Sequence, residues 1–254
     1  MAEMVAERAD ERVGKPLRVF VIGDGRMGSI VRALVEQDPD LILAGIVGMA
    51  GKDSLRSGAP AADVAIDFSH KDMLDAVEAY VVRTNAALVS GVTGYDEAEL
   101  SRLRDLGARA PVIHSANYSL GVAVLRRLAA QASAALADFD IEITETHHNQ
   151  KADAPSGTAK LLLEAVDPSG EHTPVYGRSG MCGRRDSREI GVHALRGGTV
   201  AGTHTVHFFG SDEEIELTHR ASSRRIFASG AVAAAKKLVC RKPGFYDFDK
   251  LMFG

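Results

Sequence analysis

The sequence predicts an α/β protein of two domains: a parallel sheet covered by helices, then an α+β domain whose mixed sheet has about four strands. Three features of the chain support this prediction. Short apolar runs alternate with helix-like segments over about 100 residues after residue 16, which is typical of βαβ units. A glycine-rich segment follows the first of these runs directly. The later half instead contains strand-like runs with few helical segments between them.

The composition limits the partners that the protein can have. At 254 residues, with 45% hydrophobic and 25% charged residues, the chain is typical of a globular protein with a large core. A formal net charge of −4 argues against nucleic acid bound through a basic face, and no apolar run approaches a membrane span. The charged start, residues 1–15, predicts a disordered lead-in and no secretion signal, hence a cytoplasmic protein. Cys182 and Cys240 match no metal or redox spacing, so we expect free thiols and no metal.

The first strand and the loop after it indicate a bound nucleotide. Residues 17–22 form an apolar run with β-branched residues, and residues 29–36 have helix periodicity. Between them lies the pattern G-x-G-x-x-G, in the strand–loop–helix context that a dinucleotide fingerprint requires. Its glycines permit a tight turn and let a pyrophosphate approach the helix N-terminus. The segment predicts a Rossmann-like domain that binds NADH or NADPH through Gly23, Asp24, Gly25, Arg26, Met27 and Gly28.

The second strand, residues 41–47, does not end as that fingerprint predicts. An acidic residue near its end would bind the ribose hydroxyls of NAD. Here the strand runs into Gly48 and Met49, and the next acid is Asp53. Lys52 could instead meet a 2′-phosphate, so the sequence leaves the choice between NADH and NADPH open.

Three more strands complete the predicted parallel sheet, at residues 64–68, at 86–89 and from 112. Helices are expected to separate them, and each helix has a candidate N-terminal cap. Ser69 with Asp72 resembles a capping arrangement before residues 73–82. Asp96 with Glu99 starts the next helix in the same style.

Residues 91–94 and 114–118 follow the fourth and fifth strands, at the carboxyl ends where parallel sheets bind ligands. The alternative for Gly91 and Gly94 is that they are only turn glycines. Both segments are candidates for the nicotinamide side of the nucleotide site. The candidate contacts in them are Gly91, Val92, Thr93, Ser115, Ala116, Asn117 and Tyr118.

A helix at residues 121–136 leads into the second predicted domain, and a last helix is expected at 227–239. His204 and His207 lie an odd number of residues apart in a predicted strand, so they point to opposite faces and are poor joint metal ligands. The four predicted strands are residues 141–146, 192–195, 203–209 and 214–218. The polar stretch 167–191 predicts a mobile loop whose arginines are solvated, namely Arg178, Arg184, Arg185 and Arg188.

Residues 141–160 predict an anion site. The alternation of a half-buried strand runs directly into His147 and His148, and Lys151 follows three residues later. Ser156 and Gly157 then open a helix, whose first turn has unpaired N–H groups and the positive end of the helix dipole. Such a site suits a small molecule that carries carboxylates and needs a proton donor. The alternative is that Ser156 only caps the helix and that the histidines end a strand in solvent.

Residues 145–159, E-T-H-H-N-Q-K-A-D-A-P-S-G-T-A, resemble a segment of the 4-hydroxy-tetrahydrodipicolinate reductase (dihydrodipicolinate reductase) family of bacterial and plant lysine biosynthesis. The resemblance covers nearly the whole chain after residue 16. Two departures leave the nucleotide preference open: the family's loop often has one more residue before Gly-Arg-Met-Gly, and Gly48 or Met49 replaces the acid after the second strand. Other similar segments are residues 25–28, 66–69, 91–94 and 116–119.

The resemblance implies reduction of 4-hydroxy-tetrahydrodipicolinate to tetrahydrodipicolinate by NADH or NADPH, in lysine and diaminopimelate biosynthesis, by a homotetramer. It implies a dinucleotide-binding domain at residues 16–118 and 231–254, and a substrate-binding and oligomerisation domain at 119–230. His147 would be the acid/base residue and Lys151 the proton donor. Two alternatives stay open: a related amino-acid or sugar-acid dehydrogenase, and a non-enzymatic dinucleotide-sensing regulator. The expected substrate contacts are His148, Ser156, Gly157 and Thr158.

Overall fold

The computed structural model describes residues 15–254, so the predicted lead-in lies outside the described residues apart from Lys15. The described residues form two compact units: unit 1 contains residues 15–118 and Arg225–Gly254, and unit 2 is Ser119–Arg224. The second division precedes residue 225, whereas the sequence suggested 230/231, because α8 (Arg225–Leu238) is one continuous helix. Within residues 15–254, no helix is both long enough and apolar enough to cross a membrane.

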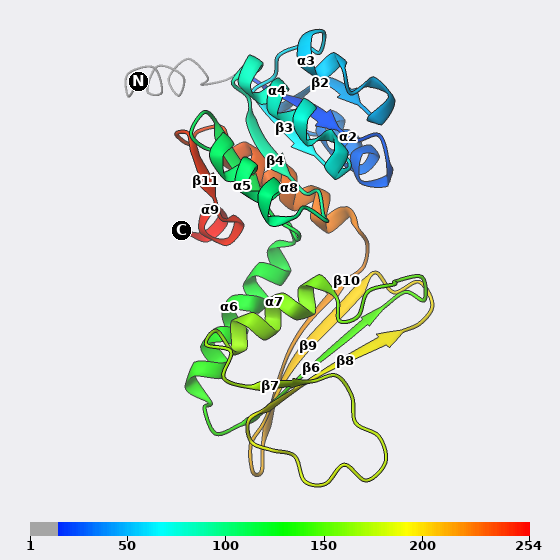
Figure 1. Cartoon of the computed structure of the whole chain (residues 1–254), viewed down its shortest axis with the longest axis vertical. Coiled ribbons are helices and arrows are strands. Elements are labelled where there is room, and N and C mark those ends of the chain that lie inside the picture. Colours follow the sequence, from blue (N-terminus) through cyan, green and yellow to red (C-terminus); the bar gives the residue numbers. More distant parts are fainter. Residues whose placement is uncertain (1–14) are drawn as a thin grey trace. The chain divides into compact units, whose positions relative to one another are not determined.

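The described part of unit 1 contains a sheet of six parallel strands in the order β11-β5-β4-β3-β1-β2 (Figure 1). Five of them are the predicted strands, and the sixth, β11, is an edge strand of three residues that sequence periodicity did not reveal. The chain passes from β1 to β2 on one side and then to β3 on the other side of β1. Such sheets bind ligands at the carboxyl ends beside this switch point. The strands are β1 (Leu17–Ile22), β2 (Leu41–Val47), β3 (Val64–Asp67), β4 (Ala87–Ser90), β5 (Pro111–His114) and β11 (Gly244–Tyr246).

Helices cover both faces of this sheet, which is why its strands are nearly continuous apolar runs. On one face, Phe20 and Ile22 pack with Tyr80 and Leu103, and all four side chains are buried. The helices are α2 (Arg26–Gln37), α3 (Ser54–Ser57), α4 (Leu74–Thr84), α5 (Glu97–Leu106), α8 and α9 (Phe248–Phe253), with short 3₁₀ turns η1 (Met49–Gly51) and η2 (Lys71–Met73).

Two predicted helix caps have different outcomes. At α5, Asp96 accepts a hydrogen bond from the Glu99 N–H and the Glu99 side chain returns one, so the predicted capping box is confirmed. The prediction that Ser69 caps the next helix is wrong. Ser69 instead donates to Asp67, because the buried carboxylate at the end of β3 needs hydrogen-bond donors. His70 caps the 3₁₀ turn η2 before that helix by accepting from the N–H of Asp72, and α4 itself has no side-chain cap.

Unit 2 contains a mixed sheet that has five strands in the described residues, in the order β10-β9-β6-β8-β7. The β6–β8 and β7–β8 pairs are parallel, and the β6–β9 and β9–β10 pairs are antiparallel. The α+β prediction is confirmed with one strand more than expected. The extra strand, β7, has three residues and lies inside the stretch predicted as a loop. The strands are β6 (Asp140–His147), β7 (Thr173–Val175), β8 (Glu189–Arg196), β9 (Gly202–Phe209) and β10 (Glu214–Ala221).

Two helices, α6 (Leu120–Ala135) and α7 (Gly157–Val166), lie on one face of this sheet (Figure 1). Ile141 and Ile143 of β6 point to that face and pack with Leu125 of α6 and Leu162 of α7. The same face of β6 continues with the buried Glu145 and His147. One strand therefore supplies the core at its start and polar groups at its end, beside the N-terminus of α7.

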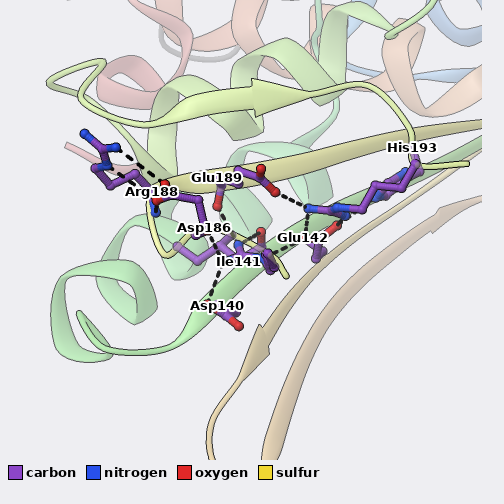
Figure 2. A network of polar contacts seen from close by, with 9 residues as sticks. Asp140, Ile141, Glu142, Asp186, Arg188, Glu189 and His193 are labelled. Carbon is purple, nitrogen blue, oxygen red and sulfur yellow. Dashed lines mark hydrogen bonds and ion pairs between the residues drawn. The ribbon is translucent and has the colours of Figure 1, made fainter. Parts of the chain in front are cut away.

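The loop between β7 and β8 is tied to the opposite face of β6. Figure 2 shows the polar contacts around Glu142, in a network that also includes Glu189 and His193 of β8. Arg178 donates to both carboxylate oxygens of Glu142 at 3.0 Å, and Arg185 donates to one at 3.1 Å. Burial alone would raise the pKa of Glu142, but hydrogen bonds from Arg178, His193 and Arg185 outweigh it and lower the pKa to about 2.

The expectation of four solvated arginines is therefore wrong for Arg178 and Arg185. Arg178 bridges the carboxylates of Glu142 and Glu189. Arg185 bridges those of Glu142 and Asp140 and also donates to backbone carbonyls. The expectation holds for the exposed Arg184 and Arg188. A cavity of about 570 Å³ is lined by this loop and Glu189, on the sheet face that carries Glu142. Cys182 in this loop and Cys240 are free and exposed, as predicted.

Candidate active site

The strand alternation of β6 brings Glu145 and His147 to one face, beside the start of α7. Glu145 is 1% exposed and His147 is 8% exposed. β6 ends at His147, and the Gly197 N–H and the His147 carbonyl hydrogen-bond as the chain leaves the sheet. The interpretation that the histidines end a strand in solvent is therefore wrong for His147. The sequence motif names His147, but Glu145 was missed, although a spacing of two in a strand signals a shared face.

Glu145 is the centre of a buried polar cluster. Its two carboxylate oxygens each accept a hydrogen bond from Arg196 at 2.9 Å, and Oε1 also accepts from the N–H of Ser156 at 3.0 Å. Oε2 forms a short hydrogen bond with Nδ1 of His147. Burial alone would raise the pKa of Glu145, but the bonds from Arg196, His147 and Ser156 lower it. Glu145 is therefore a carboxylate that holds three groups in fixed positions: the guanidinium of Arg196, the ring of His147 and the N–H of Ser156.

His147 is held in one orientation by this carboxylate. Burial lowers the pKa of His147, Glu145 opposes that effect, and the charges of Lys151 and Arg196 lower the pKa further. A neutral imidazole bonded to a carboxylate through Nδ1 carries its proton there, so Nε2 is left as an acceptor. Gly202 leaves room on that side, because a Cβ at this glycine would lie 3.0 Å from Nε2. The ring can therefore accept a proton at Nε2.

His204 completes the cluster from β9. Its ring lies edge-to-face against that of His147, with centroids 5.0 Å apart, and its Nε2 is 3.0 Å from Oγ of Ser156. Its Nδ1 is buried with no hydrogen-bond partner among the described residues. Burial, followed by the charge of His147, lowers the pKa of His204 to about 4. His207 points to the other face, toward Thr144 and Glu216, as the spacing predicted.

Lys151 and His148 lie at the rim of this cluster. Nζ of Lys151 is 2.8 Å from Oδ1 of Asp153, and the lysine side chain is 19% exposed. Its charge acts on His147, so the two groups are neighbours. His148 is half-buried, and its Nε2 lies 3.4 Å from a guanidinium nitrogen of Arg224. His148 therefore faces Arg224, whereas His147 faces Glu145.

The N-terminus of α7 is open. Ser156 caps the helix by accepting from the N–H of Ala159 at 3.2 Å, which is the role that the alternative interpretation gave it. A Cβ at Gly157 would have no atom of the described chain within 4 Å, so a ligand can approach the backbone there. Helix N-termini of this kind bind carboxylates, and Thr158 occupies the next position of the same turn.

Glu145, His147 and His204 could also hold a metal ion, since their candidate ligand atoms lie within 4.8 Å of one another. The charge of Glu145 is already matched by Arg196, however, and Lys151 adds a second positive charge nearby. A metal ion would have to displace the hydrogen bonds that Glu145 makes and would be repelled by both cations. The cluster therefore suits an anionic ligand better than a metal ion.

The glycine loop of unit 1 has the geometry of the fingerprint. Gly23 has φ +106°, and a Cβ there would meet the Phe68 carbonyl oxygen at 2.7 Å. A Cβ at Gly28 would overlap the carbonyl of Gly23, so this glycine permits close packing of α2 on β1. Gly25 is the N-cap of α2 without a side-chain cap, and a Cβ there would meet nothing within 4 Å. Asp24 and Arg26 are exposed, and Met27 is half-buried.

The segments after β4 and β5 differ in what they offer a nucleotide. Gly91 is more than a turn glycine, because a Cβ there would overlap the ring of Phe68, whereas Gly94 has φ +86° and open space around it. Thr93 is exposed, and the carbonyl of the buried Val92 bonds Nε2 of His114 at 2.9 Å.

The segment after β5 turns partly inward. Oγ of Ser115 donates to the carbonyl of Asn117 at 2.7 Å, and Ala116 is exposed. The Tyr118 hydroxyl donates to the Ser90 carbonyl at 2.8 Å in the interior. Tyr118 is 1% exposed, so its side chain belongs to the core.

Comparison with known proteins gives consistent matches. The family model described as "Dihydrodipicolinate reductase, N-terminus" matches residues 17–118, and that described as "Dihydrodipicolinate reductase, C-terminus" matches residues 121–252. The chain is 43% identical over 242 residues to the 4-hydroxy-tetrahydrodipicolinate reductase of Akkermansia muciniphila, covering 93% of this chain and 98% of the relative. It is 40% identical over 238 residues to that of Brachyspira hyodysenteriae, covering 93% and 100%.

Among solved structures, the fold is similar to the dipicolinate-bound dihydrodipicolinate reductase from Paenisporosarcina sp. TG-14. The TM-score is 0.74, the sequence identity is 21%, and the match covers 91% of this chain and 97% of that one. At this identity the likeness concerns the fold alone. It supports both predicted sheets, with the parallel one in unit 1 and the mixed one in unit 2.

Proposed function

The chain belongs to the dihydrodipicolinate reductase family, and from this premise we propose that it reduces 4-hydroxy-tetrahydrodipicolinate to tetrahydrodipicolinate in lysine and diaminopimelate biosynthesis. It is an oxidoreductase with a dinucleotide-binding fold in unit 1. The observation that carries the proposal for the site is the buried His147–Glu145–Arg196 cluster beside the open N-terminus of α7. This cluster presents an acceptor nitrogen, a lysine and helix amides to one ligand.

Unit 1 would hold NADH or NADPH at the glycine loop, because Gly25 leaves the N-terminus of α2 open to a pyrophosphate. The bound nucleotide would supply a hydride to the conjugated ring that the substrate forms when its 4-hydroxyl group leaves as water. Gly91 and the exposed Thr93 and Ala116, at the carboxyl ends of β4 and β5, would line the nicotinamide side. The remaining candidate contacts there are Val92, Ser115, Asn117 and Tyr118, of which Val92 and Tyr118 are buried and would need to move to meet a ligand.

Unit 2 would bind a small dicarboxylate. The backbone N–H groups of Gly157 and Thr158 would donate hydrogen bonds to one carboxylate of the ligand. His148 and its neighbour Arg224 would face the other carboxylate. The Paenisporosarcina reductase binds dipicolinate, a planar ring with two carboxylates. We propose the same class of ligand for this chain, because Lys151 and Arg224 supply two positive charges near His147 and His148, in addition to Arg196, whose charge is matched by Glu145.

Lys151 would donate the proton that the reduced ring needs, and His147 would serve as the acid/base residue. In the resting protein, Nζ of Lys151 is paired with the exposed Asp153. A substrate that displaces Asp153 and encloses the ammonium would favour transfer of its proton, because burial disfavours the charged form of a lysine. Glu145 does not meet the substrate in this scheme. It positions His147 and keeps the Nε2 lone pair directed outward.

We further propose a cytoplasmic homotetramer that uses unit 2 for its contacts. Leu195 and Phe209 support this, because both are large, at least 36% exposed, and on the sheet face opposite α6 and α7. Exposed apolar side chains on an uncovered sheet face favour association. Light scattering of the purified chain would test it, and a monomer at micromolar concentration would contradict it.

The reaction is tested by following the oxidation of NADH and of NADPH in the presence of the product of dihydrodipicolinate synthase. We expect turnover that is lost in Lys151→Ala, with nucleotide affinity unchanged within a few-fold. Gly157→Ala should weaken dipicolinate binding without loss of stability, since the added methyl group meets no protein atom. Dipicolinate at about 100 times its Kd should stabilise the wild type by about 2.7 kcal/mol. Oxidation of amino acids or sugar acids with NAD⁺ or NADP⁺, in place of this reduction, would favour the rival dehydrogenases.

A further inference from the structure

The end of β2 lacks the acidic side chain that an NAD-binding fold of this type uses to bind the adenine ribose. β2 ends at Val47, the next residue is Gly48, and the first acid after the strand is the exposed Asp53. The sequence alone therefore left the nucleotide preference undecided between NADH and NADPH. The structure of unit 1 supplies a carboxylate from another place.

Asp24, in the loop between β1 and α2, places its carboxylate against Gly48. A Cβ at Gly48 would lie 2.0 Å from Oδ2, 2.2 Å from Cγ and 2.4 Å from Oδ1 of Asp24. Each of these distances is too short for a non-bonded contact. The carboxylate therefore fills the space in which a side chain at position 48 would begin. The two segments are locked in register, because the Gly23 N–H donates to the Val47 carbonyl at 2.7 Å.

The carboxylate is also available to a ligand. Asp24 is exposed, and among the described residues no hydrogen bond or ion pair occupies its carboxylate. It lies one residue from Gly25, where the pyrophosphate would meet the start of α2. The adenine ribose follows the pyrophosphate directly in a dinucleotide, so the end of β2 is where its hydroxyls arrive.

We infer that Asp24 is the specificity-determining residue for the nucleotide, that its carboxylate accepts hydrogen bonds from the adenine ribose hydroxyls, and that the chain selects NADH over NADPH. A carboxylate accepts two hydrogen bonds from a vicinal diol, and it repels the 2′-phosphate that NADPH carries in place of one hydroxyl. Gly48 is required for this arrangement, since any side chain there would push the carboxylate aside. The inference rests on the proposed function, because it assumes that unit 1 binds a nicotinamide nucleotide.

The test measures the dissociation constants of NADH and NADPH separately, by nucleotide fluorescence with the purified full chain and no second substrate. We expect NADH to bind at least about tenfold more tightly, the effect of one charge-assisted contact. Asp24→Asn keeps the shape and removes the charge, so the two affinities should come within about threefold of each other. Asp53→Asn is the matched control, an exposed acid in the segment after β2, and it should leave the ratio unchanged. The competitors 5′-AMP and 2′,5′-ADP should show the same order, because they carry only the ribose end.

Two further variants separate the position of the carboxylate from its charge. Gly48→Ala keeps Asp24 but displaces its carboxylate, and should weaken NADH more than NADPH. Asp24→Ser combined with Gly48→Asp moves the acid to the end of β2 and should restore the preference for NADH. Tighter binding of NADPH that Lys52→Ala abolishes would overturn the inference, as would a preference that Asp24→Asn leaves unchanged. If the folded chain binds neither nucleotide, the proposed function is wrong and the inference falls with it.

Discussion

The substitution Glu145→Gln tests the proposed role of the buried cluster most directly. The glutamine has nearly the same shape, but it offers one acceptor oxygen and one NH₂ donor in place of a carboxylate. Arg196 and the Ser156 N–H both need an acceptor, so the oxygen is expected to face them. The NH₂ group then faces Nδ1 of His147, which must become an acceptor. The proton of the neutral imidazole moves to Nε2, and the nitrogen that should accept a proton is blocked.

The magnitudes follow from the burial of this cluster. The Glu145 side chain is fully buried and that of Arg196 is 21% exposed, so removing the negative charge leaves a guanidinium in poor solvent. Removing one partner of a buried ion pair lowers the free energy of unfolding by about 3–5 kcal/mol. Glutamine keeps one acceptor oxygen, so we expect a loss of about 3 kcal/mol. A positioned general acid or base contributes about 10²–10⁴ in rate, so we expect kcat to fall by about 10² or more.

The assay compares kcat, KM and the pH profile of Glu145→Gln with those of Glu142→Gln. Glu142 is a matched control, because it lies in the same strand, is also held by arginines, and points to the opposite face. Both variants should lose stability, but only Glu145→Gln should lose kcat. Glu145 raises the pKa of His147. In Glu145→Gln, the part of the pH profile of kcat that reports the titration of His147 should therefore move to lower pH.

A purely structural role for Glu145 would give a different pattern. In that case both variants would lose similar stability, and kcat of Glu145→Gln would stay within about threefold of the wild type at temperatures where it is folded, far short of a general acid–base contribution. The part of the pH profile that reports His147 would also stay in place. Either result would refute the assignment of Glu145 as the residue that positions His147.

Three other predictions concern protons. Burial holds the pKa of His147 below its usual range, and a bound dianion would raise it, so dipicolinate binding should take up protons near neutral pH, seen by calorimetry in buffers of different ionisation enthalpy. Burial lowers the pKa of His204 from 6.5 to about 4, so the unfolded chain binds a proton there more readily than the folded chain. The free energy of unfolding should therefore fall by up to about 3 kcal/mol as the pH drops from 6.5 toward 4. In urea unfolding, His204→Gln should flatten this pH dependence. Burial raises the pKa of Asp67 from 3.8 to about 6, so the folded state binds the extra proton and stability falls as pH rises through that window. Asp67→Asn should therefore stabilise the chain by up to about 3 kcal/mol at pH 7.5.

Each of these has an outcome that contradicts it. Equal binding enthalpies in all buffers would mean that no proton is taken up with dipicolinate. A pH dependence that His204→Gln leaves unchanged would place the responsible group elsewhere. Loss of stability in Asp67→Asn at pH 7.5 would mean that the carboxylate is better solvated than its burial indicates.

Much of the fold could be predicted from the sequence because its signals are local. The apolar runs of β1 to β5, the helix periodicity of α6 and α8, and the capping box at Asp96 depend on neighbours within a few residues. The short edge strands β7 and β11 could not be predicted, because three residues carry no readable period. They exist only because a longer strand is beside them to supply hydrogen bonds.

The site divides in the same way. The motif placed His147, Lys151, Ser156 and Gly157 around one strand end and one helix start, since residues close in sequence stay close when a strand turns into a helix. The partners that set their chemistry are distant: Arg196 reaches Glu145 across 51 positions, and His204 reaches Ser156 across 48.

The sequence by itself determined the order of the elements, the family and the residues at the helix tip, because these depend on short-range periodicity and a compact motif. Only the tertiary structure decided which charges meet. Sheet pairing brings Arg196 on β8 and His204 on β9 to the two sides of Glu145 on β6, and the Val47–Gly23 contact brings Asp24 to the empty position at Gly48. Whether a carboxylate is buried, paired or open to a ribose depends on segments far apart in the chain, so no local pattern specifies it.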